Sequence, residues 1–327
     1  MKISEETGRI IFSGLLVTSL VLIGYNYIST SDKKDENKIQ FEMIKKYLVN
    51  SSSLAKSNKP ILWIHNDYKL NDRNWQSFGS RNSNELNKPV IYLTVDSIIK
   101  KCDKSFNICL IDDNSFNNLI PGWNIDLDEV PEPNKTHYRT LALLQLLYIF
   151  GGMIVPSSML CFSNLNKVYK DFTNENKFFI TECYPNSVLS SYTNAFPSMK
   201  IIGCEKNNNN IKSLFTLLES VFVKSQTNET NFKGTLNKYL NMYVTENLCN
   251  IVSGKVFGYF DNEMNPIKVD DLMSDTPIDM SEKNIGVDIP IDEIIERKHY
   301  DWFSKINLDE LPKVKNNIGY LLKQIYD

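Results

Sequence analysis

The chain has 327 residues, of which 42% are hydrophobic and 23% are charged, and its net charge is −3. A chain of this length and composition can build one large α/β domain with a full core, or two smaller domains. The absence of a basic surplus argues against binding through nucleic-acid phosphates, so no nucleic-acid partner is expected.

Six cysteines are scattered along the chain without a Cys-x-x-Cys pair, which argues against a zinc site. Several lie in apolar runs, so buried free thiols are the favoured interpretation. A disulfide is the alternative in an oxidising compartment. The six are Cys102, Cys109, Cys161, Cys183, Cys204 and Cys249.

Residues 10–29 predict one N-terminal transmembrane helix. No charged side chain occurs between Arg9 and Asp32, and a span of about 20 apolar residues matches the bilayer core. A cleaved signal peptide is the alternative, although no small-residue cleavage motif follows the span. The predicted localisation is therefore a membrane, crossed once.

The orientation of this anchor stays open, because lysine and arginine flank both of its ends. The lysines that follow the span slightly favour a cytosolic position for the rest of the chain. Three Asn-x-Ser/Thr sequons give weak support for a lumenal position instead. They begin at Asn50, Asn134 and Asn228.

The composition divides the chain into consecutive parts. Residues 1–9 form a short tail before the anchor, and residues 30–58 are a charged, Ser/Asn/Lys-rich stem. Residues 59–270 are expected to form the main domain. Residues 271–327 are expected to form a helical extension packed on that domain.

Apolar runs and helical periodicity alternate through the main domain, which predicts an α/β sheet with mostly parallel strands flanked by helices. The expected strands are residues 61–64, 106–111, 153–155, 177–182 and 198–204. The expected helices are residues 89–101 (with a strand at 90–95 as the alternative), a helix from about 137 to 150, and residues 165–169, 210–225, 232–248, 292–303 and 311–326.

Polar side chains follow the first two expected strands. His65 and Asp67 come after the first, and Asp112 and Asp113 come after the second. Ligands of open α/β sheets bind at the carboxyl ends of the strands, so these residues are candidates for a binding site. The alternative for each carboxylate is a helix N-cap or turn residue, which is common for Asp after a strand.

The most distinctive segment is a helix that runs through Tyr148 into the pair Gly151-Gly152 and then into an apolar strand, residues 153–155. Glycine stops a helix here because a left-handed C-cap costs it nothing sterically. This segment resembles the sugar-nucleotide-binding core of the DXD-type glycosyltransferases, close to initiating α-mannosyltransferase-like and capsular-polysaccharide-type enzymes. The resemblance covers roughly residues 59–205, and its specific part is residues 148–155.

The resemblance implies a glycosyltransferase-A-like (Rossmann-like) fold and a nucleotide-sugar pocket. In that family the strand after the glycines ends in Asp-x-Asp, which holds a divalent metal, whereas this chain has Pro156-Ser157-Ser158. No metal ligand is therefore predicted, and Mn²⁺ or Mg²⁺ is expected only if other carboxylates supply the ligands. The residues implied for the pocket are His65, Asp67, Asp112, Asp113, Arg139, Gly151, Gly152, Ser157 and Ser158.

Arg139 and His137 lie near the start of the Gly-Gly helix, where a guanidinium could bind a diphosphate. Their alternative is a solvated helix start. Glu182 and Trp302 are candidates for the acceptor side. Their alternatives are a turn carboxylate and an aromatic docked into the core.

The function implied by the resemblance is transfer of a hexose from a nucleotide sugar to a glycan or protein acceptor. The implied location is an endomembrane of Golgi type. The alternative is a catalytically inactive relative that serves as a membrane-tethered binding or scaffold protein, since a fold alone does not fix a function.

Overall fold

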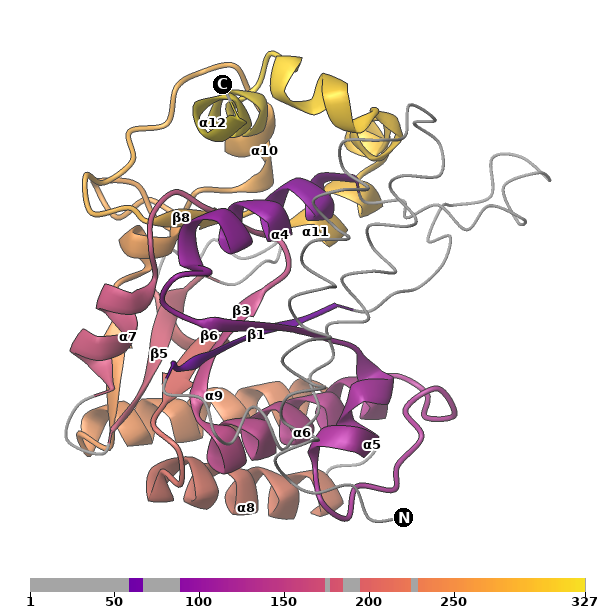
Figure 1. Cartoon of the computed structure of the whole chain (residues 1–327), viewed down its shortest axis with the longest axis vertical. Coiled ribbons are helices and arrows are strands. Elements are labelled where there is room, and N and C mark those ends of the chain that lie inside the picture. Colours follow the sequence, from indigo (N-terminus) through magenta and orange to yellow (C-terminus); the bar gives the residue numbers. More distant parts are fainter. Residues whose placement is uncertain (1–58, 67–88, 174–176, 185–194, 225–228, 327) are drawn as a thin grey trace, which may run out of the picture. The chain divides into compact units, whose positions relative to one another are not determined.

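The computed structural model describes residues 59–66, 89–173, 177–184, 195–224 and 229–326 (Figure 1). All of these fall within one compact unit, Lys45–Asp327. The expected anchor, the expected stem and Asp67 lie outside the described residues. No helix in the described ranges combines the length and apolar character that a membrane crossing needs.

A six-stranded sheet with the order β2-β1-β3-β6-β5-β7 forms the centre of the fold. β6 is antiparallel to both of its neighbours, and the other three pairings are parallel. The mostly parallel α/β sheet expected from the sequence is confirmed. The strands are β1 (Ile61–His65), β2 (Asn107–Ile111), β3 (Gly152–Pro156), β5 (Phe178–Cys183), β6 (Phe196–Cys204) and β7 (Cys249–Val252).

Helices cover both faces of this sheet. α6 (Asn134–Phe150), α8 (Asn209–Lys224) and α9 (Glu229–Thr245) lie on one face, and α4 (Pro89–Cys102) lies on the other (Figure 1). Successive side chains of a strand point to opposite faces. Trp63 accordingly belongs to the buried cluster beneath α6 and α8. The helix expected at residues 89–101 is confirmed against its strand alternative.

A second, two-stranded antiparallel sheet joins β4 (Met159–Cys161) to β8 (Gly286–Asp288). Neither strand is predicted by the sequence, because three residues are too few to show a period. The expected domain boundary at residue 270 falls inside α10. The shorter helices are α5 (Phe116–Leu119), α7 (Asn166–Phe172), α10 (Val269–Met273), α11 (Ile291–Glu296) and α12 (Asn317–Tyr326).

Two expected C-terminal helices are shorter in the structure than in the prediction. α11 ends because Arg297 is extended, and a 3-10 helix, Lys298–Lys305, follows it. The segment Leu308–Lys313 is also a 3-10 helix, and it contains Pro312, which has no N–H to donate. α12 therefore begins only at Asn317, after the extended residue Val314.

The Gly-Gly pair ends α6 as predicted. Gly151 is its C-cap with φ 69°, and Gly152 follows with φ 100°, conformations that other residues rarely adopt. A Cβ on Gly152 would lie 2.1 Å from the Ile61 carbonyl oxygen, so only glycine allows β3 to approach β1 here. Trp63 Nε1 donates a hydrogen bond of 3.0 Å to the Gly151 carbonyl and fixes the turn against β1.

Candidate functional site

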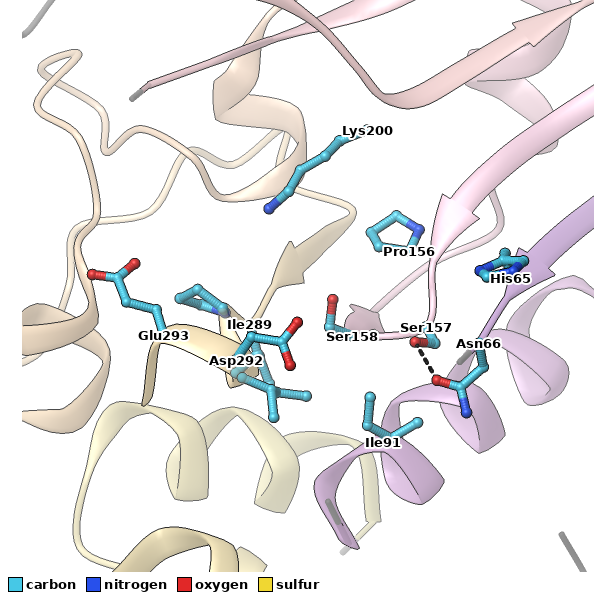
Figure 2. A pocket seen from close by; sticks show the side chains of 12 residues that line it. His65, Asn66, Ile91, Pro156, Ser157, Ser158, Lys200, Ile289, Asp292 and Glu293 are labelled. Atoms are coloured by element: carbon cyan, nitrogen blue, oxygen red, sulfur yellow. Dashed lines mark hydrogen bonds between the residues drawn. The ribbon is translucent and has the colours of Figure 1, made fainter. Parts of the chain in front are cut away.

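A pocket of about 370 Å³ lies at the carboxyl ends of β1 and β3. The chain places β2 on one side of β1 and then β3 on the other, so the strand order reverses between β1 and β3. Such a reversal is where open α/β sheets bind ligands. The lining residues are His65, Asn66, Ile91, Lys200 and residues 156–158 and 289–293 (Figure 2).

The two serines that follow β3 tie the pocket wall together. Ser157 Oγ donates to Asn66 Oδ1 at 3.1 Å, which joins the ends of β3 and β1 (Figure 2). The Ser157 carbonyl accepts from Thr94 Oγ1 of α4 at 2.6 Å. Ser158 Oγ donates to Asp288 Oδ1 at 2.6 Å, which joins β3 to the end of β8.

Asp288 is a buried carboxylate next to this wall, with a side chain only 1% exposed. Besides Ser158, its Oδ2 accepts from Lys200 Nζ and from the Tyr259 hydroxyl, each at 2.8 Å. Burial raises the pKa of Asp288, but the Lys200 charge and the three hydrogen bonds outweigh it and hold the pKa below its usual value. The carboxylate is therefore ionised at neutral pH.

The residues at this end of β3 do not fit a divalent metal ion. Mg²⁺ and Mn²⁺ need several oxygen ligands, and carboxylates are the usual ones. Asp288 contacts Ser158, but the ammonium of Lys200 already lies against this carboxylate and would repel a second cation. Across the described ranges, no group of three His, Cys, Asp or Glu side chains is arranged to hold a metal.

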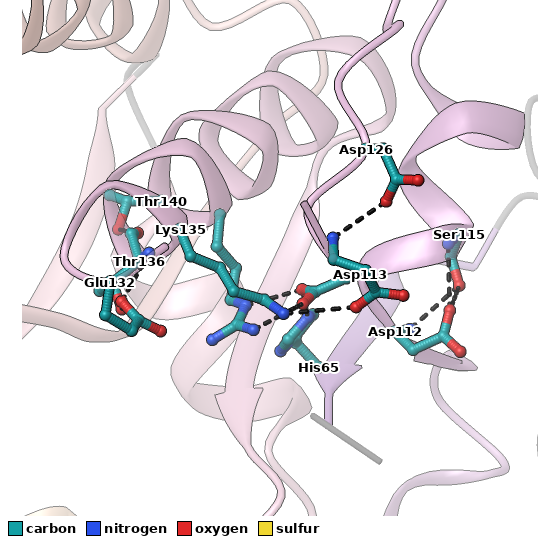
Figure 3. Close-up of polar contacts among 11 residues, drawn as sticks. His65, Asp112, Asp113, Ser115, Asp126, Glu132, Lys135, Thr136 and Thr140 are labelled. Atoms are coloured by element: carbon teal, nitrogen blue, oxygen red, sulfur yellow. Dashed lines mark hydrogen bonds and ion pairs between the residues drawn. The ribbon is translucent and has the colours of Figure 1, made fainter. Parts of the chain in front are cut away.

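A second polar cluster surrounds Asp113, just after β2 (Figure 3). Arg139 contacts both carboxylate oxygens, Nε to Oδ1 at 2.7 Å and Nη2 to Oδ2 at 2.6 Å. His65 Nε2 lies 2.9 Å from Oδ1, and Lys135 Nζ lies 3.5 Å from Oδ2. Burial raises the pKa of Asp113, but hydrogen bonds from Arg139 and His65 outweigh it and hold the pKa far below its usual value.

His65 connects this cluster to the pocket, because it contacts Asp113 and also lines the pocket wall. Its ring stacks on Phe116 with centroids 5.7 Å apart. A ring that is fixed on one side by stacking and on the other by a carboxylate has one orientation at the edge of the pocket.

Asp112 caps the 3-10 helix Asp113–Ser115 (Figure 3). Its Oδ1 accepts from Ser115 N at 3.0 Å and from Ser115 Oγ at 2.6 Å. This is the N-cap arrangement that the sequence offered as the alternative to a nucleotide contact.

Other predicted site residues lie away from the pocket. Gly151 and Gly152 lie at the amino end of β3, whereas the pocket lies at its carboxyl end. Glu182 Oε2 accepts from Gly254 N at 3.2 Å at the start of the 3-10 helix Gly254–Phe257. Trp302 is 44% exposed and is not among the residues that line the pocket.

His137, the other proposed diphosphate contact, is buried in α6. Its ring packs edge-on against Phe222 of α8, with centroids 5.4 Å apart. Among the helix-start candidates, only Arg139 therefore joins the strand-end polar groups, through Asp113.

Sequence reasoning missed Lys200 and Asp288. A lone lysine interrupts the apolar run of β6, which marks Lys200 as unusual, but nothing local indicates that it reaches the pocket. Asp288 also stands between apolar neighbours, Val287 and Ile289, but nothing local indicates that it reaches Ser158.

No protein-family model matches the chain, and no curated protein matches it. The chain is similar to a solved structure titled "PaToxG Glycosyltransferase". The two are 13% identical, the match covers 64% of this chain and 80% of that chain, and the TM-score is 0.34. Membership of the DXD-type family stays a proposal.

Proposed function

We propose that the chain is a sugar transferase that holds a nucleotide sugar in the pocket between the ends of β1 and β3. The observation that carries this proposal is the position of the pocket at the reversal of strand order, where nucleotides bind in open α/β sheets. Its volume lies in the range of about 300–1,000 Å³ that is usual for small-molecule sites.

The lining suits such a ligand. Hydroxyl and amide groups of Asn66, Ser157 and Ser158 can contact ribose or sugar hydroxyls, and the Lys200 ammonium supplies positive charge for phosphate. Ile91 and Ile289 offer apolar surface to a base or sugar ring. The acceptor in this proposal is a glycan or protein hydroxyl, and residues 10–29 anchor the enzyme in an endomembrane.

The test is calorimetric binding of UDP-sugars and GDP-sugars to the full chain, followed by a transfer assay. Ser157→Trp is expected to fill the pocket and abolish binding. Ser163→Trp is the matched control, because Ser163 is exposed and lies outside the pocket. Binding that survives Ser157→Trp unchanged would place the ligand elsewhere and contradict the proposal.

A non-catalytic binding protein is the second candidate. It is favoured by the contacts of two carboxylates that the resemblance implied for the pocket. Asp112 caps a 3-10 helix, and Asp113 is paired with Arg139. Neither carboxylate is directed to a ligand by these contacts. Binding of a nucleotide sugar without either transfer or hydrolysis would support this candidate.

A further inference from the structure

Lys200 reaches the pocket through an irregularity in β6. β6 runs antiparallel to β3, with Ile202 opposite Ile154, so its earlier residues lie beside the carboxyl end of β3. On its other edge, adjacent residues of β5 pair with Ile202 and Ser198, so the register shifts across Lys200. Such bulges re-aim a side chain and are frequent next to functional sites.

The Lys200 ammonium is held by Asp288 and belongs to a side chain that lines the pocket. It donates one hydrogen bond of 2.8 Å to the buried Asp288 carboxylate, while the Lys200 side chain remains 40% exposed. Figure 2 shows the ammonium directed into the space between Ser158, Asp292 and Glu293. An ammonium has three protons, so protons remain that can be donated into the pocket.

The charge of this ammonium is secure at neutral pH. Burial lowers the pKa of Lys200, but the Asp288 charge and the hydrogen bond outweigh it and raise the pKa above its ordinary value. Asp288 in turn is held by Ser158 and Tyr259 as well as by Lys200. The Lys200 ammonium is therefore a positive charge held in a fixed position by its partner carboxylate.

Two further carboxylates of the pocket restrict where an anion can lie. Asp292 and Glu293 also line the pocket, and the Asp292 charge acts on Lys200. Glu293 is also paired with Arg297 at 2.5 Å. Two carboxylates repel phosphate, so phosphate groups are favoured on the side of Lys200 and Ser158. Hydroxyl groups of a sugar are favoured on the carboxylate side, where they can donate.

We propose that the Lys200 ammonium, held by Asp288, is the cation that pairs with the diphosphate of the bound nucleotide, at the strand end where members of the resembled family hold a metal ion. This inference rests on the proposed function, because it names the group that binds the diphosphate in the same pocket. The inference explains how a chain with the Gly-Gly turn of the resembled family could bind a diphosphate without the Asp-x-Asp metal ligands. A carboxylate still holds a cation beside the end of β3, but both come from the protein.

The experiment measures binding of UDP and GDP to the full chain by calorimetry in EDTA, with uridine and guanosine as phosphate-free probes. The native chain is expected to bind one diphosphate without metal, and added Mn²⁺ is expected to leave the affinity unchanged. The double variant Lys200→Met/Asp288→Asn removes both charges together, so no lone charge stays buried. It is expected to weaken diphosphate binding about 10- to 100-fold and to leave nucleoside binding unchanged.

Two matched variants accompany it. Lys200→Arg keeps the positive charge and is expected to retain diphosphate binding far better than the double variant does. Lys283→Met removes an exposed lysine outside the pocket and is expected to bind as the native chain does. Equal diphosphate affinity in the native chain and the double variant would overturn the inference.

A measurement on the native chain does not depend on the folding of any variant. Bound diphosphate is expected to protect Lys200 from acetylation, read by mass spectrometry, while Lys283 continues to react. Bound diphosphate with no protection of Lys200 would overturn the inference, as would binding that requires Mn²⁺, and both would leave the proposed function standing. Failure of the native chain to bind any nucleotide or nucleotide sugar would overturn the proposed function and this inference with it.

Discussion

Arg139 donates a hydrogen bond to each carboxylate oxygen of Asp113, from Nε at 2.7 Å and from Nη2 at 2.6 Å. The contact joins the first turns of α6 to the end of β2. A two-point guanidinium–carboxylate contact fixes direction as well as distance, so it sets the position of α6 at the edge of the sheet that carries the pocket. His65 shares the same carboxylate and lines the pocket, so the ion pair also supports the pocket wall.

Asp113→Asn is expected to lower the free energy of unfolding at pH 7 by about 2–4 kcal/mol, because it removes the carboxylate charge that Arg139 contacts at both oxygens in a largely buried position. The pKa of Asp113 is depressed in the folded chain, so its contribution is complete above the unfolded value of about 4. The contribution is lost as the pH falls below that value. Urea denaturation at pH 7 and pH 3 should therefore show a smaller difference between native and variant at pH 3.

The control for this prediction is Asp128→Asn. Asp128 also contacts Lys135, at 3.4 Å, but its side chain is 68% exposed. Exposed ion pairs contribute little, so a change below about 1 kcal/mol is expected at either pH. A loss as large as that of Asp113→Asn would show that the buried position of Asp113 is not what matters.

Gly152→Ala is expected to destabilise the chain by at least about 3 kcal/mol, because both the positive φ and the collision with the Ile61 carbonyl act against it. Gly122→Ala separates these two causes. Gly122 has φ 80°, and nothing lies within 4 Å of an added Cβ, so only the backbone term of about 1–2 kcal/mol remains. Thermal and urea denaturation of the two variants measures the difference, and equal losses would contradict it.

Asp112→Ala is expected to cost about 1 kcal/mol of stability and to leave nucleotide-sugar binding unchanged, because the structure uses Asp112 as a helix cap. Asp112→Asn retains an oxygen that can accept from Ser115 N, so a smaller loss is expected. Unfolding and calorimetry on the same preparations give both readouts. A loss of nucleotide-sugar binding without a loss of stability would contradict the prediction and indicate that Asp112 contacts the ligand.

The cysteines of the folded chain are expected to resist thiol reagents, because all six are buried and free, as their apolar settings predict. Burial raises the pKa of Cys109 and of Cys249 to about 12, and the thiolate is the reactive form. A hydrogen bond with Cys161 lowers the pKa of Cys102, so that thiol is protected by its burial alone. Titration with Ellman's reagent should be slow in buffer and should reach six thiols in denaturant. Rapid reaction of any cysteine in buffer would contradict the burial described here.

The sequence predicts the parts of the fold that depend on local patterns. Apolar runs locate β1, β2, β3, β5 and β6, because their pattern can be recognised within a few residues. The Gly-Gly pair locates the end of α6, because few other residues adopt a positive φ. The sequence does not predict that β6 is antiparallel to its neighbours, since the residue pattern of a strand is the same in either direction. β4 and β8 are missed because three-residue strands carry no period.

The site is predicted only where it follows strand ends. His65 and the two serines after β3 are brought to one pocket, as strand-end reasoning suggests. Lys200 comes from the middle of an antiparallel strand, and its use at the pocket depends on a register shift that no sequence pattern announces. Asp288 meets Ser158 across 130 positions of chain, a pairing that only the folded structure reveals.

That separation has a consequence for how the protein is made. Translation reaches Ser158 and Lys200 long before it reaches Asp288. A nascent or prematurely terminated chain can therefore contain every strand of the large sheet and still lack the carboxylate that pairs with Lys200. The pair of Lys200 and Asp288 can therefore form only late in synthesis. A product that stops short of β8 has the sequence of the large sheet but cannot form the charged pair beside Ser158.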